Sequence, residues 1–305
     1  MIRRPLFLVN PTAAGGRAAR WWSAAVPVLR RQFPDLTGTV VADRDQLPDL
    51  LAAAKRDGNR TIIGVGGDGT HHAIVNALVS TGLSQDFSYA PLPLGTGNDW
   101  CRTLGLPRHL VRWLAVLRQG RSVEHRIGRL DLPGGGTRYF MNVAGLAYDA
   151  EVVRRAATHD FKRPWLYPLF TACYLPAYRP PRLRLTYDDQ VVEDRFHTIN
   201  VGIGRYNGGG MRLVPHADPR ADDFALTYAA SLPVGRIAAN GWRFFTDTIG
   251  KVEGVITTRA RQITVTGPTD VEADGEFLGA GPVTMCLADV RIRVHCGDLR
   301  DPSLP

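Results

Sequence analysis

The stretch GVGGDGTHHAIVNAL, Gly64 to Leu78, decides how the first part of the chain folds. It joins an apolar run to a segment with helix-spaced apolar residues, and the corner between them holds two glycines, Asp68, a third glycine and Thr70. Glycine lets the backbone approach a ligand closely, and the free N–H groups at the start of a helix favour an anion. This corner therefore indicates a site for a phosphate-bearing ligand.

The residues around this corner repeat the same order of strand, corner and helix. We expect strands over 6–10, 37–42 and 61–65, and helices over 17–31, 47–56 and 71–79. Apolar strands linked by helices predict a mostly parallel sheet with both faces covered, a Rossmann-like α/β domain over residues 1–122. In such sheets ligands bind at the carboxyl ends of the strands, where the glycine-rich corners lie.

After Glu124 the pattern changes to short runs with period-two alternation, such as RLRLTY (182–187) and FALTYAA (224–230). These runs predict a β-rich, sandwich-like domain over residues 123–305, with the last strand or tail free to return to the first domain. The aromatic segment Pro164–Tyr178 interrupts the alternation and is expected to be helical between its prolines. It either packs against the sandwich or lies on an anionic membrane surface.

Composition narrows the class of protein. The 305 residues carry a net charge of +8, almost all of it from arginine, because the chain has only three lysines. The arginines are dispersed and not interleaved with aromatic residues, so we expect no nucleic-acid partner. No apolar run approaches the ~20 residues of a membrane-spanning helix. The four cysteines are scattered and are expected to be free thiols in a reducing cytosol.

Three glycine-rich corners follow strands in the first domain: NPTAAGG (10–16), GGDGT (66–70) and PLGTGND (93–99). Each offers N–H groups and a threonine hydroxyl to phosphate oxygens. None is a GxxxxGK[ST] loop or a GxGxxG loop, so a nucleotide site of another design is predicted. Asp68 does not attract phosphate directly, and would instead lie beside Mg²⁺ or hold a nucleophilic hydroxyl.

The order GGDGT followed by PLGTGND resembles the diacylglycerol kinase catalytic domain family, which includes bacterial diacylglycerol kinases, YegS-type lipid kinases and the sphingosine and ceramide kinases. Further segments resemble the same family: NVAGLAYDAEVV (142–153), GGGMRLVPHADPRADD (208–223) and VEADGE (271–276). The resemblance runs nearly the full length of the chain. It implies transfer of the ATP γ-phosphoryl group to a lipid hydroxyl, with ATP and Mg²⁺ as cofactors.

The resemblance also implies roles for individual residues. Glu276 would be the proton acceptor, and Asp274 and Asp68 would hold Mg²⁺ or orient the lipid hydroxyl. A structural Mg²⁺ would lie at Pro219, Asp222 and Phe224. The ATP site would be lined by Asn10, Pro11, Thr12, Ala13, Ala14, Gly66, Gly67, Asp68, Gly69, Thr70, His71, His72, Gly95, Thr96 and Asn98.

Three departures from the family pattern bear on the nucleotide. His71, His72 and Ala73 stand where the family has hydrophobic-Asn-Glu, Ala42 replaces a threonine, and Asp223 stands where glycine is common. We expect these departures to alter nucleotide affinity and base preference. The DGE tripeptide is open to a second interpretation, since Asp-Gly is also a common hairpin turn.

The function predicted from the sequence is an ATP-dependent lipid kinase that converts diacylglycerol to phosphatidic acid. The alternatives are a sphingoid- or ceramide-type lipid kinase, an NAD kinase, and a nucleotide sensor without catalysis. A lipid alcohol substrate implies a cytoplasmic protein in transient, peripheral contact with the inner face of the membrane. An edge strand of the second domain could pair to form a homodimer.

Overall fold

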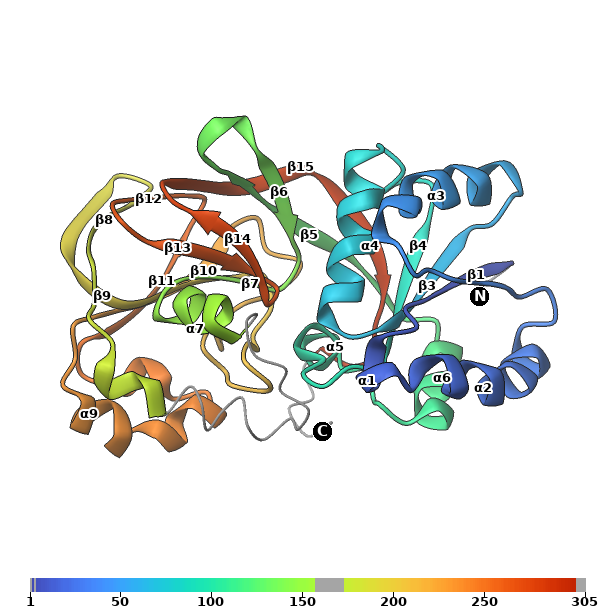
Figure 1. Ribbon diagram of the computed structural model, residues 1–305, viewed down its shortest axis with the longest axis horizontal. Coiled ribbons are helices and arrows are strands. Elements are labelled where there is room, and N and C mark those ends of the chain that lie inside the picture. The colour runs from blue at the N-terminus through green and yellow to red at the C-terminus, as the bar shows by residue number, and fades with distance from the viewer. Residues whose placement is uncertain (1, 3, 157–172, 300–305) are drawn as a thin grey trace. The chain divides into compact units, whose positions relative to one another are not determined.

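The computed structural model describes residues 2, 4–156 and 173–299, which fall into two compact units (Figure 1). The first unit comprises residues 1–125 together with 289–305, and the second comprises residues 126–288. Most of the aromatic segment expected to be helical, residues 164–172, lies outside the described residues. The chain passes from the first unit to the second within β5 (Ser122–Asp131) and returns within β15 (Val283–His295).

The first unit is built on a parallel sheet in the order β15-β4-β3-β1-β2. Its other strands are β1 (Pro5–Val9), β2 (Thr37–Val40), β3 (Thr61–Gly66) and β4 (Ser88–Pro93). Every residue of β1 and β3 is buried, because helices cover both faces of the sheet. The predicted Rossmann-like α/β fold is confirmed.

The helices of the first unit are α1 (Ala13–Gly16), α2 (Ala18–Gln32), α3 (Leu47–Arg56), α4 (Asp68–Ser80), α5 (Asp99–Thr103) and α6 (Leu110–Arg118). In Figure 1, α3 and α4 lie on one face of the sheet, and α2 and α6 lie on the other. The aromatic ring of Phe7 on β1 packs 5.3 Å from that of Trp22 on α2. Alternate residues of the central strands thus supply the two apolar layers of the unit.

The second unit is rich in antiparallel strands, as predicted. Besides parts of β5 and β15 it contains β6 (Thr137–Phe140), β7 (Val143–Ala147), β8 (Arg182–Tyr187), β9 (Gln190–Gly202), β10 (Phe224–Ala230), β11 (Val255–Ala260), β12 (Gln262–Thr266), β13 (Asp270–Ala273) and β14 (Glu276–Ala280). One sheet has the order β11-β10-β9-β7-β13-β14, with antiparallel neighbours throughout. The other runs β9-β8-β12-β15-β5-β6.

Strand β9 belongs to both sheets of the second unit. Residues 190–195 pair with β8, and residues 198–202 pair with β7 and β10. Side chains from both sheets, among them Leu146, Phe196 and Ile263, form one buried core between them. The sandwich-like architecture expected from the alternation is confirmed.

Helix α7 (Tyr148–Ala156) was not expected from the sequence; it packs against β7 and β13. Two short helical turns, α9 (Val234–Ala239) and η4 (Gly241–Phe245), follow β10 and bury none of their residues. Residues 283–295 form one continuous strand, β15, although the polar residue Asp289 interrupts their apolar pattern.

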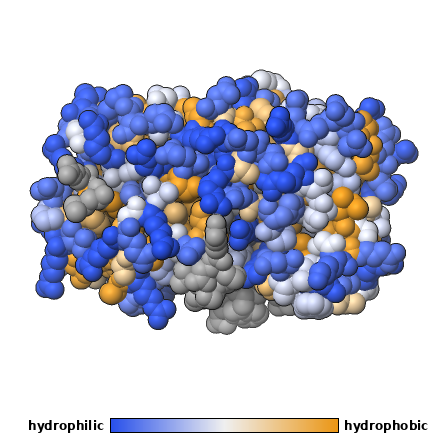
Figure 2. Space-filling view, turned by 180° about the vertical axis from the view of Figure 1, so that it is seen from behind, coloured by the Kyte–Doolittle hydropathy of each residue, from blue (hydrophilic) through white to orange (hydrophobic). Residues whose placement is uncertain are grey.

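Hydrophilic side chains cover most of the face drawn in Figure 2, and the apolar areas on it are small and separate. None of the described helices is both long enough and apolar enough to cross a bilayer. All four cysteines are free thiols, as expected.

Candidate functional site

The three glycine-rich corners emerge at the same edge of the first unit's sheet, because β1, β3 and β4 are parallel neighbours and each corner follows one of them. Hydrogen bonds join the corners directly. The Asn10 side chain donates from Nδ2 to Thr70 Oγ1 over 2.9 Å, and Leu94 N donates to Gly66 O over 2.7 Å. The first and third corners are therefore each tied to the second.

Two of the glycines are required by close packing, Gly95 between the third and second corners and Gly66 within the second corner. A Cβ atom added at Gly95 would lie 2.4 Å from Gly67 Cα, and one added at Gly66 would lie 2.3 Å from Thr70 Oγ1. Both distances are far below a van der Waals contact. Backbone therefore packs on backbone where GGDGT meets PLGTGND, and Gly69 completes the first turn of α4.

The NPTAAGG corner is a tight turn held by its own asparagine. Asn10 Oδ1 accepts hydrogen bonds from Thr12 N (2.9 Å) and Thr12 Oγ1 (2.8 Å). The chain then enters the left-handed region at Ala14, with φ of 56°, and stays there over the two glycines. Pro11 and Ala13 lie on the same turn. A Cβ atom at Gly15 or Gly16 would meet open space, so nothing in this unit crowds the turn.

Asp68 joins the second corner to the third. Its Oδ2 atom accepts from Asp99 N and its Oδ1 atom from Trp100 N, both over 3.2 Å. These two N–H groups belong to the first turn of α5, where a helix has donors without partners and favours a negative charge. The carboxylate expected beside Mg²⁺ therefore also caps a helix.

The third corner is held by Asn98, which lies in the left-handed region with φ of 55° and is buried. Its Oδ1 atom accepts from Gly95 N over 2.9 Å, and its Nδ2 atom donates to Gly95 O over 2.8 Å. Arg108 donates to the carbonyl oxygens of Gly95 and Thr96. Sequence reasoning missed Arg108, which brings a guanidinium next to the exposed Thr96.

The side chains of His71 and His72 are both buried. His71 Nδ1 shares a hydrogen bond of 2.7 Å with Tyr89 OH, and its Nε2 atom lies 3.8 Å from Cys101 Sγ. Burial lowers the pKa of His71 to about 3, so the ring is neutral at physiological pH. The imidazole of His71 belongs to the core of the unit, which leaves the backbone of this residue as the part able to line a nucleotide site.

A cavity of about 100 Å³ opens beside the first corner. Asn10, Thr12 and Thr70 line it together with Ala42 and Ala73, the two positions where this chain departs from the family pattern. Arg44 and apolar side chains from β1, α3 and α4 complete the lining. Both departures therefore shorten side chains that face the same space, next to the hydroxyls expected to meet phosphate.

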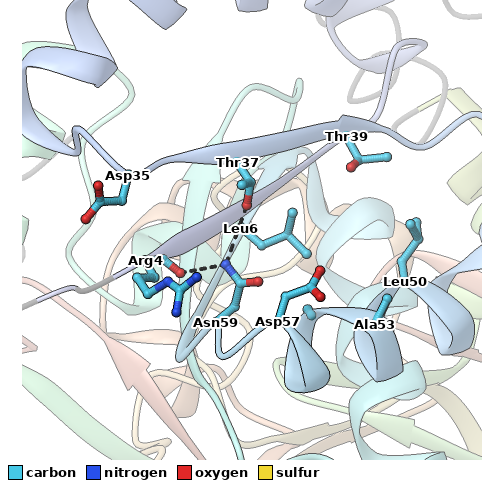
Figure 3. A pocket seen from close by; sticks show the side chains of 10 residues that line it. Arg4, Leu6, Asp35, Thr37, Thr39, Leu50, Ala53, Asp57 and Asn59 are labelled. Carbon is cyan, nitrogen blue, oxygen red and sulfur yellow. Dashed lines mark hydrogen bonds between the residues drawn. The ribbon is translucent and has the colours of Figure 1, made fainter.

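A larger cavity of about 490 Å³ lies at the opposite end of the same strands, between α3 and the strands β1 and β2 (Figure 3). Asn59 donates there from Nδ2 to Arg4 O over 2.8 Å. Arg4 precedes β1 and Asn59 precedes β3, whereas the glycine-rich corners follow these strands. This cavity is therefore not part of the phosphate edge.

In the second unit, Asp274 and Gly275 form the two-residue turn between β13 and β14. Both have positive φ, 53° and 82°, which is the geometry of a type I′ hairpin turn. The turn interpretation of DGE, open in the sequence, is correct for its backbone. Glu276 is the first residue of β14, opposite Ala273, and its side chain is partly exposed.

The carboxylate of Asp274 is turned into the unit. Its Oδ1 atom accepts from Asn142 N over 2.9 Å and its Oδ2 atom from Met141 N over 3.1 Å. Asp274 N in turn donates to Val143 O over 2.9 Å. These hydrogen bonds fasten the hairpin to the start of β7. Asp274 therefore has a structural role, because it fixes the turn that leads to Glu276.

Sequence reasoning missed a second carboxylate behind the hairpin. Glu272 is fully buried, and its carboxylate accepts from Gly275 N (3.0 Å) and from Asn207 Nδ2 (3.1 Å). Burial, reinforced by the charge of Asp149, raises the pKa of Glu272 to about 8.

Burial also raises the pKa of Asp149, whose carboxylate accepts from the side chains of Thr198 and Asn200. Glu272 belongs to the segment VEADGE and Asp149 to the segment NVAGLAYDAEVV. Neither sequence indicates that the two carboxylates are buried near each other.

The predicted structural Mg²⁺ site is organised around an arginine. Pro219 O accepts a hydrogen bond of 2.8 Å from Arg126 N, and the Asp222 carboxylate pairs with the Arg126 guanidinium. Phe224 begins β10 and is buried. Among the described residues no cluster of three or more His, Cys, Asp or Glu side chains is placed to hold a metal. The Asp222 carboxylate, which was expected to bind Mg²⁺, thus faces the guanidinium of Arg126.

Comparison with known proteins covers both units. Residues 4–130 match the family model of the diacylglycerol kinase catalytic domain, and residues 142–296 match that of the YegS C-terminal NAD kinase beta sandwich-like domain. A protein named diacylglycerol kinase from Mycobacterium tuberculosis is 27% identical over 292 residues, covering 94% of this chain and 93% of the relative. A protein named "Probable lipid kinase YegS-like" from Stenotrophomonas maltophilia is 28% identical over 300 residues, covering 94% of each.

The crystal structure of a diacylglycerol kinase from Bacillus anthracis strain Sterne has the same fold, with a TM-score of 0.72 and 21% identity over 99% of this chain and 98% of that one. The glycine-rich corners lie in the first matched region and the DGE hairpin in the second. The chain belongs to the lipid kinase family that is defined by the diacylglycerol kinase catalytic domain and the YegS-type C-terminal domain.

Proposed function

We propose that this protein transfers the γ-phosphoryl group of ATP to a lipid hydroxyl, and that diacylglycerol is the acceptor, giving phosphatidic acid. The observation that carries the proposal is the meeting of GGDGT and PLGTGND at one sheet edge, in a chain whose two units both match this family. Diacylglycerol is preferred to sphingoid bases and ceramides as the acceptor because relatives of this chain are named for it. Relatives are named both for diacylglycerol and for lipid in general.

In this proposal the first unit binds ATP. The turn from Asn10 to Ala14, the corner from Gly66 to Thr70 and the loop from Gly95 to Asn98 would present N–H groups and hydroxyls to the phosphates. The start of α4 would add the positive end of a helix. Mg²⁺ bound with ATP would neutralise part of the phosphate charge, and we assign Asp68, at the start of α4, to that ion.

The second unit would supply the proton acceptor. Glu276 is partly exposed at the start of β14, whereas Asp274 and Glu272 are buried and hold the turn that precedes it. As the lipid oxygen bonds to phosphorus, its proton must leave, and a carboxylate close to the hydroxyl lowers the barrier. We therefore assign acceptance of the proton to Glu276 and positioning to the other two.

We also propose that the second unit touches the inner face of the membrane through residues 234–251. Trp242 and Phe245 are 57% and 58% exposed on η4. The guanidinium of Arg243 lies 4.4 Å from the Trp242 ring, and Lys251 is exposed nearby in sequence. Exposed aromatic rings with basic neighbours are typical of contact with an anionic bilayer surface.

A homodimer through an edge strand of this unit stays a prediction. A measurement of the molar mass of the protein in solution would test it.

The first test is a transfer assay with ATP labelled on the γ-phosphate and Mg²⁺, in mixed micelles of diacylglycerol, monoacylglycerol, sphingosine or ceramide, with NAD offered separately. We expect label in diacylglycerol. Glu276→Ala should lower the rate on the order of 10²- to 10⁴-fold, the usual contribution of a general base. Glu253→Ala, which removes an exposed glutamate from the same unit, should leave the rate unchanged.

Each outcome of this assay decides between functions. Label in sphingosine or ceramide would identify a different lipid acceptor for the same phosphoryl transfer. Label in NAD would establish the NAD kinase alternative. ATP binding without transfer to any acceptor would support the nucleotide sensor, and full activity of Glu276→Ala would remove the proton acceptor from the proposal.

A further inference from the structure

The loop HADPRADD, His216 to Asp223, carries three carboxylates, and an arginine meets each of them. Arg220 pairs with Asp218, with Nη2 at 2.7 Å from Oδ2 and Nε at 2.8 Å from Oδ1. Arg126 pairs with Asp222. The third carboxylate, Asp223, faces Arg259 of β11, whose Nε atom lies 2.9 Å from Oδ1.

The carbonyl oxygens of the same loop also receive N–H donors. Arg259 donates from Nη1 to His216 O over 2.8 Å, and Arg205 donates from Nε to Ala217 O over 3.1 Å. The backbone N–H of Arg126 donates to Pro219 O over 2.8 Å. Three carbonyl oxygens of this loop, among them that of Pro219 from the expected ligand set, therefore accept N–H groups from β5, β11 and the segment after β9.

Arg126 holds a particular place in this arrangement, because it contacts two of the three residues expected to bind Mg²⁺, Pro219 and Asp222. Its side chain is only 16% exposed, whereas that of Asp222 is 68% exposed, so the guanidinium lies on the inner side of the pair. A guanidinium is charged at every physiological pH and binds a carboxylate in a fixed geometry. A divalent cation placed here would meet that positive charge at close range.

We infer that Arg126 is the resident cation of this loop, in the position that the resemblance to the family gives to Mg²⁺. The second unit therefore holds the loop 216–224 by arginine–aspartate pairs and needs no divalent metal to do so. This inference concerns the folded state without nucleotide and does not depend on the proposed kinase activity. It also accounts for part of the excess of arginine over lysine, since lysine lacks the planar fork that such pairs use.

The inference is tested on the full chain without nucleotide, by thermal unfolding in EDTA and in millimolar Mg²⁺. A metal site at ~100 times its Kd would raise the unfolding midpoint by roughly 5 to 10 °C in a chain of this size. We expect the two midpoints to agree within about 1 °C, less than a quarter of that shift. A midpoint raised several degrees by Mg²⁺, with the rise abolished in Asp222→Asn, would overturn the inference.

Variants of Arg126 test whether the charge of the arginine, and not a metal ion, stabilises the loop. Arg126→Gln should lower the midpoint, because the largely buried arginine side chain loses both its packing and its pair with Asp222. Arg126→Lys, which keeps the charge, should lose less, and Arg184→Gln, which breaks an exposed pair with Glu193, should change little. Arg126→Asp adds a carboxylate beside Asp222 and should make stability depend on Mg²⁺ or Ca²⁺. If Arg126→Gln is as stable as the parent chain, the arginine is not the resident cation; if it does not fold, the comparison in EDTA still decides.

Discussion

At Glu272 a single buried carboxylate does two things: it holds the hairpin turn through Gly275 N, and it keeps its proton at neutral pH. An ordinary glutamate has a pKa of about 4.3, whereas burial raises that of Glu272 to about 8. As pH rises between these values, the unfolded chain releases this proton and the folded chain retains it. The folded state then binds more protons, so stability falls as pH rises through this window and levels off above about pH 8.

Glu272→Gln should remove this contribution, because glutamine is neutral at every pH. We expect the stability of the variant to decline less than that of the parent chain between about pH 5 and pH 8, measured as the urea midpoint. Asp149, whose pKa burial also raises, keeps its own part of the decline. Glu253→Gln, at an exposed site, serves as the control and should follow the parent. Parallel curves for Glu272→Gln and the parent would show that the carboxylate is ionised when buried.

The side-chain contacts of His71 and Arg126 could not be predicted from the local sequence. The resemblance to the family implied that His71, at the start of α4 and next to the phosphate corner, lines the nucleotide site. Its partner Tyr89 lies on the next strand, and that pairing sends the ring into the core. Arg126 and Asp222 are 96 positions apart, so no local pattern joins them.

At the scale of elements, the first unit was the easier half to predict. Helix 47–56 coincides with α3, and strand 61–65 with all but the last residue of β3, because apolar spacing and turn residues agree there. Helix α4 begins at Asp68, three residues before the expected start at 71, since Gly67 is its N-cap. Helix α7 was missed because YDAEVVRRA is short and mixes apolar with charged residues; it packs on β7 and β13 and buries only Ala150 and Val152.

The contact between the second and third corners yields a prediction about glycine. Gly95→Ala would place a methyl group 2.4 Å from Gly67 Cα, and backbone cannot turn aside as a side chain does. We expect the free energy of unfolding to fall by about 1 to 3 kcal/mol, the usual cost of overpacking, and ATP binding to weaken as the corners separate. Urea denaturation and a calorimetric titration with ATP measure the two effects.

Gly136→Ala is the matched control, because a Cβ atom there meets nothing within 4 Å and φ is ordinary at −73°. It should be as stable as the parent chain. If Gly95→Ala behaves in the same way, the two corners are less tightly packed than described, and the glycines serve the ligand alone.

For the whole molecule, the proposed membrane contact predicts binding to vesicles. Two rings that are more than half exposed would enter the interface, and their removal should weaken binding at least tenfold, roughly 1.4 kcal/mol. The test is sedimentation of the full chain with vesicles of phosphatidylglycerol and phosphatidylcholine, comparing the parent with Trp242→Ala/Phe245→Ala. Val111→Ala, at an apolar site exposed on α6 of the first unit, is the control. Equal binding by the double variant would place the contact elsewhere on the chain.

The return of β15 to the first unit has a consequence for the order in which the protein is made. Arg293 and Val294 pair with Ser88 and Tyr89 of β4, about two hundred positions earlier in the chain. While the ribosome is still synthesising the second unit, the nascent first unit has an open edge at β4. Contacts of such long range form late. A chaperone that shields strand edges would therefore find its target in this interval, before residue 293 emerges.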